Sequence, residues 1–197
     1  MSRARAFDID TAIDRALHEF WRKGYEGTSI ADLTEALGIN RPSLYAAFGN
    51  KEGLFRKALE RYLDGPAAGI QGALEAPTAR AAAERILYFH ADAAGDARRP
   101  EGCLLVQGAL ACSEESEPIR EALIEARRAG ELALTERFKR AKAEGDLGSE
   151  ENPAELSRYV WTVCHGLSVE ASAGATRAEQ RRVVARALRA FPESKSN

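Results

Sequence analysis

Apolar residues recur every three to four positions along most of this chain, as is typical of amphipathic α-helices packed on a core. In the first such segment Ile13, Leu17 and Phe20 fall on one face, and Gly24 supplies a C-terminal stop. The pattern predicts an all-α fold of about nine helices. The expected helices are 9–23, 30–37, 41–48, 51–63, 78–94, 102–112, 118–143, 153–173 and 177–191.

Composition supports the helical interpretation. The chain has 37 alanines against 21 Val, Ile and Thr residues in total, and alanine favours helices whereas β-branched residues favour strands. Between Gly65 and Thr78, glycines and prolines leave two alternatives open, an interrupted helix or a loop.

Charge and cysteine content exclude several classes of protein. The 28 basic and 30 acidic residues give a net charge of −2, so this is not a polybasic nucleic-acid coat protein. No apolar run reaches the length of a membrane span. Three cysteines do not make a disulfide framework, which indicates a reducing, cytoplasmic location. The three scattered histidines lack metal-ligand spacing, so we expect no metal and no cofactor.

The stretch from Thr28 to Lys51 has the spacing of a helix-turn-helix unit. Ser29 can cap a short helix that ends at Gly38, and Asn40 can cap a second short helix. In such a unit the second helix presents its N-terminal residues to the DNA major groove. Ile39 to Lys51 holds two basic residues and no acidic one. The spacing therefore predicts a DNA-binding head.

The side chains of this stretch suit DNA contact. A forked Arg guanidinium can pair with guanine, and proline can touch a thymine methyl. Hydroxyl and ammonium groups can donate to phosphate oxygens. The predicted DNA-contacting residues are Thr28, Arg41, Pro42, Ser43, Tyr45 and Lys51.

Other interpretations remain open for the same stretch. Short helix pairs with a glycine turn are common in all-α proteins, so the unit could serve packing alone within a helical interaction or adaptor protein. We find no P-loop, dinucleotide fingerprint, nucleophile elbow or paired-carboxylate motif, so we predict no enzymatic activity and no catalytic residue. Salt-dependent DNA binding would separate these classes.

Five short motifs in one register resemble the N-terminal signature of TetR/AcrR-type transcriptional regulators. They are Gly24–Ile30, Leu37–Ile39, Ser43–Tyr45, Phe48 and Lys51–Leu54. The resemblance implies a homodimeric repressor that binds a palindromic operator and is released by a small organic effector. It implies a DNA-binding head over 1–50 and a ligand-binding and dimerisation body over 51–197. One departure is Ala46-Ala47, where the family often carries an aromatic or histidine beside the motif tyrosine.

A dimer is also expected on physical grounds, because two heads related by symmetry can read half-sites about 34–36 Å apart. We expect the last two long helices to form the interface. The alternative is that their apolar stripe packs only within its own subunit. The candidate interface residues are Ser157, Val160, Cys164, Ser168, Ala171, Val184, Ala187, Leu188 and Phe191.

An effector pocket is expected between the middle helices, since small organic molecules suit a mostly apolar pocket with a few polar groups. The alternative is that the same stripe is ordinary core. The candidate lining residues are Leu87, Phe89, His90, Val106, Leu110, Phe138 and Trp161. Cys103 stands in a Gly-Cys-Leu setting similar to that of family members that sense electrophiles or oxidants. A small buried hydrophobe is the other interpretation.

Overall fold

The computed structural model describes residues 7–110 and 113–193. Over this part of the chain it shows ten α-helices and one short 3-10 helix, and no strand. The predicted all-α fold is confirmed, and the additional helix, α5, lies in the segment where helix or loop was left open. The elements are α1 (Ile9–Lys23), α2 (Ile30–Leu37), α3 (Arg41–Phe48), α4 (Lys51–Asp64), α5 (Gly69–Leu74), α6 (Ala79–Asp92), α7 (Leu104–Leu110), η1 (Glu114–Ser116), α8 (Glu117–Ala143), α9 (Pro153–Ser172) and α10 (Arg177–Leu188).

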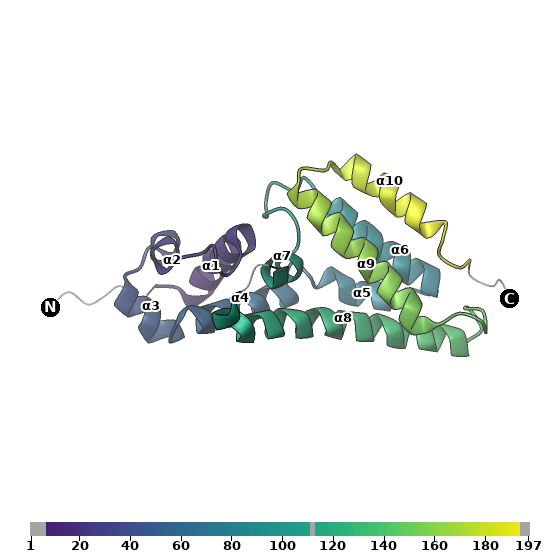
Figure 1. Cartoon of the computed structure of the whole chain (residues 1–197), viewed down its shortest axis with the longest axis horizontal. Helices are drawn as coiled ribbons and strands as arrows, with labels where there is room; N and C mark the ends of the chain where they lie inside the picture. Colours follow the sequence, from purple (N-terminus) through teal and green to yellow (C-terminus); the bar gives the residue numbers. More distant parts are fainter. Residues whose placement is uncertain (1–6, 111–112, 194–197) are drawn as a thin grey trace.

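The first three helices form a head at one end of the molecule (Figure 1). Ser29 and Asp32 make a reciprocal capping box at the start of α2, and Asn40 caps α3. Gly38 ends α2 with a φ of 69°, a left-handed conformation that glycine adopts without steric cost. Leu33 and Leu44 are fully buried, so α2 and α3 are each anchored by an apolar side chain from their inner face.

Helix α4 joins the head to the rest of the molecule. Its first half contributes Phe55, whose ring lies 5.0 Å from that of Phe20 on α1. Near its end, the Tyr62 ring packs edge-on against Trp21, with centroids 4.8 Å apart. The same apolar cluster continues into α7 and the start of α8 through Leu104. Helix α4 therefore shares one apolar cluster with the head helices and with α7 and α8.

The body is a layered bundle of α5, α6, α8, α9 and α10 (Figure 1). The 27-residue α8 runs from beside the head to the far end of the molecule, with α9 packed across it and α10 outermost. Ile86, Leu134, Phe138 and Cys164 belong to one buried cluster that joins these helices. The body thus has its own apolar core, and α8 extends along both cores.

No helix of the described residues is long and apolar enough to cross a membrane. Over the same residues, no group of three or more histidine, cysteine or acidic side chains is placed to hold a metal ion.

Candidate DNA interface, effector cavity and subunit contact

The start of α3 stands out from the head as an exposed edge. Arg41, Pro42 and Tyr45 are exposed, and 45% of the Tyr45 surface is accessible. Asn40 holds this edge in shape because its side-chain oxygen accepts the Ser43 backbone N–H at 2.9 Å. Leu44, fully buried on the opposite side, fixes the helix to the head. Arg41, Pro42 and Tyr45 are therefore available to a partner on a rigid base.

Thr28 lies differently from the other predicted DNA-contacting residues. Its side chain is fully buried, and its hydroxyl donates to the Gly24 carbonyl at 2.7 Å. The hydroxyl thus closes the loop between α1 and α2 instead of facing outward. Sequence reasoning assigned Thr28 to DNA contact because a hydroxyl can serve either role, and only the packing separates the two.

Lys51 sits at the first position of α4 with its ammonium over an aromatic ring. The Lys51 Nζ lies 4.2 Å from the centroid of the Tyr25 ring, a cation–π contact. Partial burial lowers the pKa of Lys51, while the nearby carboxylates of Glu26 and Asp32 oppose that shift. Asn50 caps the helix by accepting the Gly53 N–H at 2.7 Å. The ammonium is thus held close to the start of α4.

Glu26 connects the head to the body. Its carboxylate accepts the Ser113 backbone N–H at 3.0 Å and the Ser113 hydroxyl at 2.7 Å. Hydrogen bonds from the Ser116 and Ser113 hydroxyls lower the pKa of Glu26 to about 2. A displacement of the segment before α8 therefore reaches the loop that carries Tyr25, the ring beneath Lys51.

A cavity of about 280 Å³ lies in the body between the ends of several helices. It is lined by Leu63, Asp64, Ala67, Ile70, Gln71, Leu74, His90, Cys103, Leu105, Ala126, Arg127, Ala129, Gly130, Ala133, Trp161 and His165. A smaller hollow of about 50 Å³ shares several of these residues and adds Phe89. Because Leu63 and Asp64 end α4, the cavity wall includes the helix that carries Lys51 at its other end.

An aromatic group forms one side of the cavity. The Trp161 ring lies 5.7 Å from the His90 ring and 5.9 Å from the His165 ring, between centroids. Burial lowers the pKa of His90 to about 4, and burial also lowers the pKa of His165, helped by the charge of Arg127. Both imidazoles are therefore neutral near pH 7.

Cys103, on the wall of the same cavity, accepts a hydrogen bond at 3.3 Å from the Tyr62 hydroxyl. Its side chain is 9% exposed. This arrangement fits the small buried hydrophobe and leaves the redox interpretation a hypothesis.

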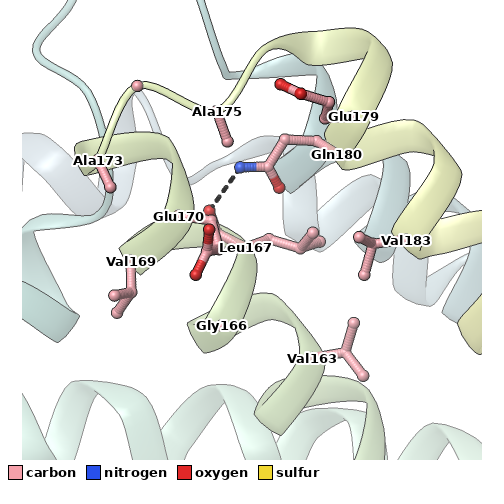
Figure 2. A pocket seen from close by; sticks show the side chains of 11 residues that line it. Val163, Gly166, Leu167, Val169, Glu170, Ala173, Ala175, Glu179, Gln180 and Val183 are labelled. Atoms are coloured by element: carbon pink, nitrogen blue, oxygen red, sulfur yellow. Dashed lines mark hydrogen bonds between the residues drawn. The ribbon is translucent and has the colours of Figure 1, made fainter.

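A broad groove of about 850 Å³ runs along the outer side of α9 and α10 (Figure 2). Val163, Val169 and Val183 project into it, and Val169 and Val183 are 47% and 50% exposed. Gly166 lies in its floor, with no atom near the position of a Cβ. Gln180 ties the two helices together by donating to the Leu167 carbonyl at 2.8 Å. The groove is therefore open and lined by exposed apolar side chains.

Comparison with known proteins assigns the family. The family described as "Bacterial regulatory proteins, tetR family" matches residues 12–58, and the "Tetracyclin repressor-like, C-terminal domain" matches residues 82–191, more than half of the chain. The chain belongs to the TetR family. The HTH-type transcriptional repressor ComR of Escherichia coli K12 is 33% identical to it over 193 residues, which cover 97% of this chain and 92% of ComR.

Solved structures agree with this membership. A cysteine-substituted form of the TetR family transcriptional regulator CifR, complexed with 26-bp double-strand operator DNA, is 45% identical with a TM-score of 0.92. That match covers 96% of this TetR-family chain and 100% of CifR. A TetR-family regulator from Rhodococcus sp. RHA1 is 40% identical with a TM-score of 0.63, covering 94% of this chain and 100% of the other. The similarity therefore extends over head and body together.

The residues predicted for the subunit contact of this TetR-family protein are buried within the single chain. The nine residues proposed for it all face the interior of their own subunit, and none is more than 8% exposed. A regular apolar stripe marks the buried face of a helix, so the sequence pattern selected the core side of α9 and α10. The nine residues predicted for the subunit contact are Ser157, Val160, Cys164, Ser168, Ala171, Val184, Ala187, Leu188 and Phe191.

The predicted effector residues divide into two groups. Phe89, His90 and Trp161 line the two cavities. Leu87, Val106 and Phe138 are at most 4% exposed and pack in the core. For these three residues, the alternative that the stripe is ordinary core fits the structure. The side chain of Leu110 and all of Cys112 lie outside the described residues.

Most of the cavity lining was missed from sequence, including its polar residues Arg127 and His165. Arg127 resembles any charged residue on the exposed face of a long helix, and His165 stands alone without metal-ligand spacing. The one available signal was the group of small residues around Arg127, Ala126, Ala129, Gly130 and Ala133, which leaves room beside α8.

Proposed function

We propose that this TetR-family regulator is a repressor that binds a palindromic DNA operator as a homodimer and leaves it when a small organic effector binds. The observation that carries the proposal is the exposed start of α3, anchored by Leu44 and capped by Asn40. The relative CifR, which shares this fold along nearly its whole length, is described in complex with operator DNA. Acting on an operator would place this chain with the chromosome, in the bacterial cytoplasm.

Each predicted DNA-contacting residue of α3 has a chemical role in this proposal. Arg41 would donate to guanine O6 and N7 in the major groove, and Pro42 would contact a thymine methyl. Ser43 and Tyr45 would donate to phosphate oxygens and fix the helix in the groove. Lys51 would reach a phosphate from the start of α4. Thr28 would act indirectly, by holding the loop before α2.

A second copy of the chain is the proposed occupant of the groove on α9 and α10. Val169 and Val183 are exposed in the single chain and lie on one face (Figure 2). Two copies related by a two-fold axis would bury this face and hold the two heads for half-sites about 34–36 Å apart. In this proposal the head at 1–50 binds DNA, and the body at 51–197 binds the effector and the second copy. Helix α4 belongs to the body by residue range but also packs against the head.

In this proposal, an effector bound in the cavity would affect the head through helix α4. Leu63 and Asp64 on the cavity wall end α4, and Lys51 begins the same helix. A ligand that favours another position of α4 would change the separation of the two heads, and it can do so only by its difference in affinity for the two states.

A footprint on the DNA upstream of its own coding sequence tests the repressor proposal. We expect a two-fold symmetric protected region and an affinity that falls steeply with added salt. A helical adaptor protein would leave this DNA unprotected at every salt concentration, and that result would overturn the proposal.

A further inference from the structure

Two buried N–H groups on the cavity wall have no hydrogen-bond partner among the described residues. They are the indole Nε1 of Trp161 and the guanidinium Nε of Arg127. Trp161 as a whole is only 8% exposed. A buried donor without a partner costs about 1–3 kcal/mol, so such groups are uncommon in folded proteins. Two such donors on the wall of one cavity indicate that the cavity binds a ligand with a hydrogen-bond acceptor.

Charge selects the kind of acceptor. Within the described residues no carboxylate forms an ion pair with Arg127, and Glu131, one turn further along α8, is held by Arg158 at 2.9 Å. Asp64 is exposed. The two imidazoles on the wall are neutral near pH 7. The Arg127 guanidinium is therefore not paired with a carboxylate among the described residues, which favours an anionic acceptor.

The Trp161 indole is fixed before any ligand arrives. The rings of His90 and His165 contact it, and Gly130 lets α8 approach its edge: a Cβ at Gly130 would lie 2.9 Å from Trp161 Cζ2. A clamped ring holds its N–H in one direction, which lowers the entropy lost when an acceptor binds.

Besides these two donors, the cavity wall has a large apolar part and a few polar side chains, among them Asp64 and Gln71. Ile70, Leu74, Leu105 and the alanines of α8 belong to the apolar part, and the cavity volume of about 280 Å³ suits a small molecule. Such a wall would bury a hydrocarbon body while the head group meets the two donors.

We infer that the effector of this regulator is a small hydrophobic carboxylic acid whose carboxylate accepts hydrogen bonds from Arg127 and Trp161. The inference rests on the proposed function, because it names the chemistry of the effector that the repressor would answer to. A carboxylate has enough lone pairs to accept both donors at once. The corresponding primary amide keeps the shape and one acceptor oxygen but lacks the charge.

Calorimetry with matched acids and amides tests this chemistry on the full chain. The probes are phenylacetate, cyclohexanecarboxylate and hexanoate, each with its primary amide. We expect at least one acid to bind about tenfold or more tightly than its amide, because hydrogen bonds to a charged group are roughly twice as strong as neutral ones. Equal affinities of acid and amide, or no binding by any of the three acids, would overturn the inference.

Three variants assign the binding to the named donors. Arg127→Met removes the guanidinium at similar length and should weaken the best acid about tenfold or more while leaving its amide unchanged. Trp161→Phe keeps an aromatic ring, removes the N–H and should weaken the acid by a smaller factor. Arg128→Met, next along α8 and exposed, is the matched control and should bind the acid like the parent chain. Loss of acid binding in Arg128→Met, or full binding in Arg127→Met, would contradict the assignment.

The same preparations are assayed for operator binding, so the two proposals can fail separately. A chain that protects its operator yet binds none of the acids retains the repressor function and refutes the inference. A chain that binds the acids but no DNA refutes the repressor function.

Discussion

In our proposal, Arg41 is the residue that recognises a base of the operator sequence. Arg41→Ala should weaken the specific site by about 1–3 kcal/mol and relax base preference at one position in each half-site. Arg56→Ala is the control, because Arg56 is exposed on α4 and paired with Glu52 at 2.9 Å. Quantitative binding to the operator and to single-base variants measures both effects. An equal loss on specific and unrelated DNA would show that Arg41 contacts the phosphate backbone instead.

His90 should make the stability of the body depend on pH. Its folded pKa of about 4 lies below the ordinary 6.5, so between these values the unfolded chain binds a proton that the folded chain does not. The free energy of unfolding is therefore unaffected by His90 above pH 6.5 and falls as pH drops from 6.5 to 4, by an amount on the order of 2 kcal/mol.

Urea denaturation at pH 7 and pH 4.5 checks this dependence. His90→Asn keeps a side-chain donor near the Ile86 carbonyl, which His90 Nδ1 contacts at 2.9 Å, and should lose less stability on acidification. His18→Asn, on the exposed face of α1, should behave like the parent chain. A His90→Asn protein with the parent's full pH dependence would contradict the assignment.

At the scale of single residues, the sequence predicted those positions that depend on local structure. Arg41, Pro42 and Tyr45 were predicted at the start of a capped helix, and the structure has them exposed there. Sequence reasoning failed where the role depends on distant packing. Thr28 could be assigned inward, and Arg127 toward a cavity, only after α1, α8 and α9 were assembled.

At the scale of helices, boundaries were predictable because the caps are local. Ser29 and Asn40 each satisfy the free N–H groups of the helix that follows, so α2 and α3 begin where the sequence indicated. The face that we propose for the subunit contact was not predictable in this way. Val169 and Val183 are isolated apolar residues on mostly polar faces, and such positions carry no period to detect.

The outer face of α9 and α10 gives a prediction that separates assembly from folding. Val183→Glu should yield monomers that keep helical content and thermal stability, because Val183 is 50% exposed in the single chain. Leu188→Glu should instead destabilise the fold, since Leu188 is 7% exposed and the charge would enter the core.

Sedimentation velocity measures the oligomeric state of both variants, and circular dichroism measures their helical content and thermal stability. Leu132→Glu is the control, a similar change at a 63% exposed position on α8. A Val183→Glu protein that stays dimeric would move the subunit contact to another face.

At the scale of the whole molecule, the proposed switch is bound by reciprocity. If phenylacetate or a related acid weakens the operator by some factor, saturating operator must weaken that acid by the same factor. Such factors are typically about 5–150. Calorimetric titration of the acid with and without operator DNA measures the factor in one direction, and operator binding with and without acid measures the other. Equal acid affinity in both states would rule out that acid as an inducer.

Helix α8 makes the two ends of the molecule mechanically dependent. Its 27 residues form one rod about 40 Å long. Trp161 presses on it at Gly130, near the midpoint, and the segment before its first turn bonds to Glu26 of the head. With the indole as fulcrum, a tilt of about 5° would carry each end through about 2 Å. In our proposal, a small tilt at the cavity would thus become a larger displacement where α8 meets the DNA-binding head.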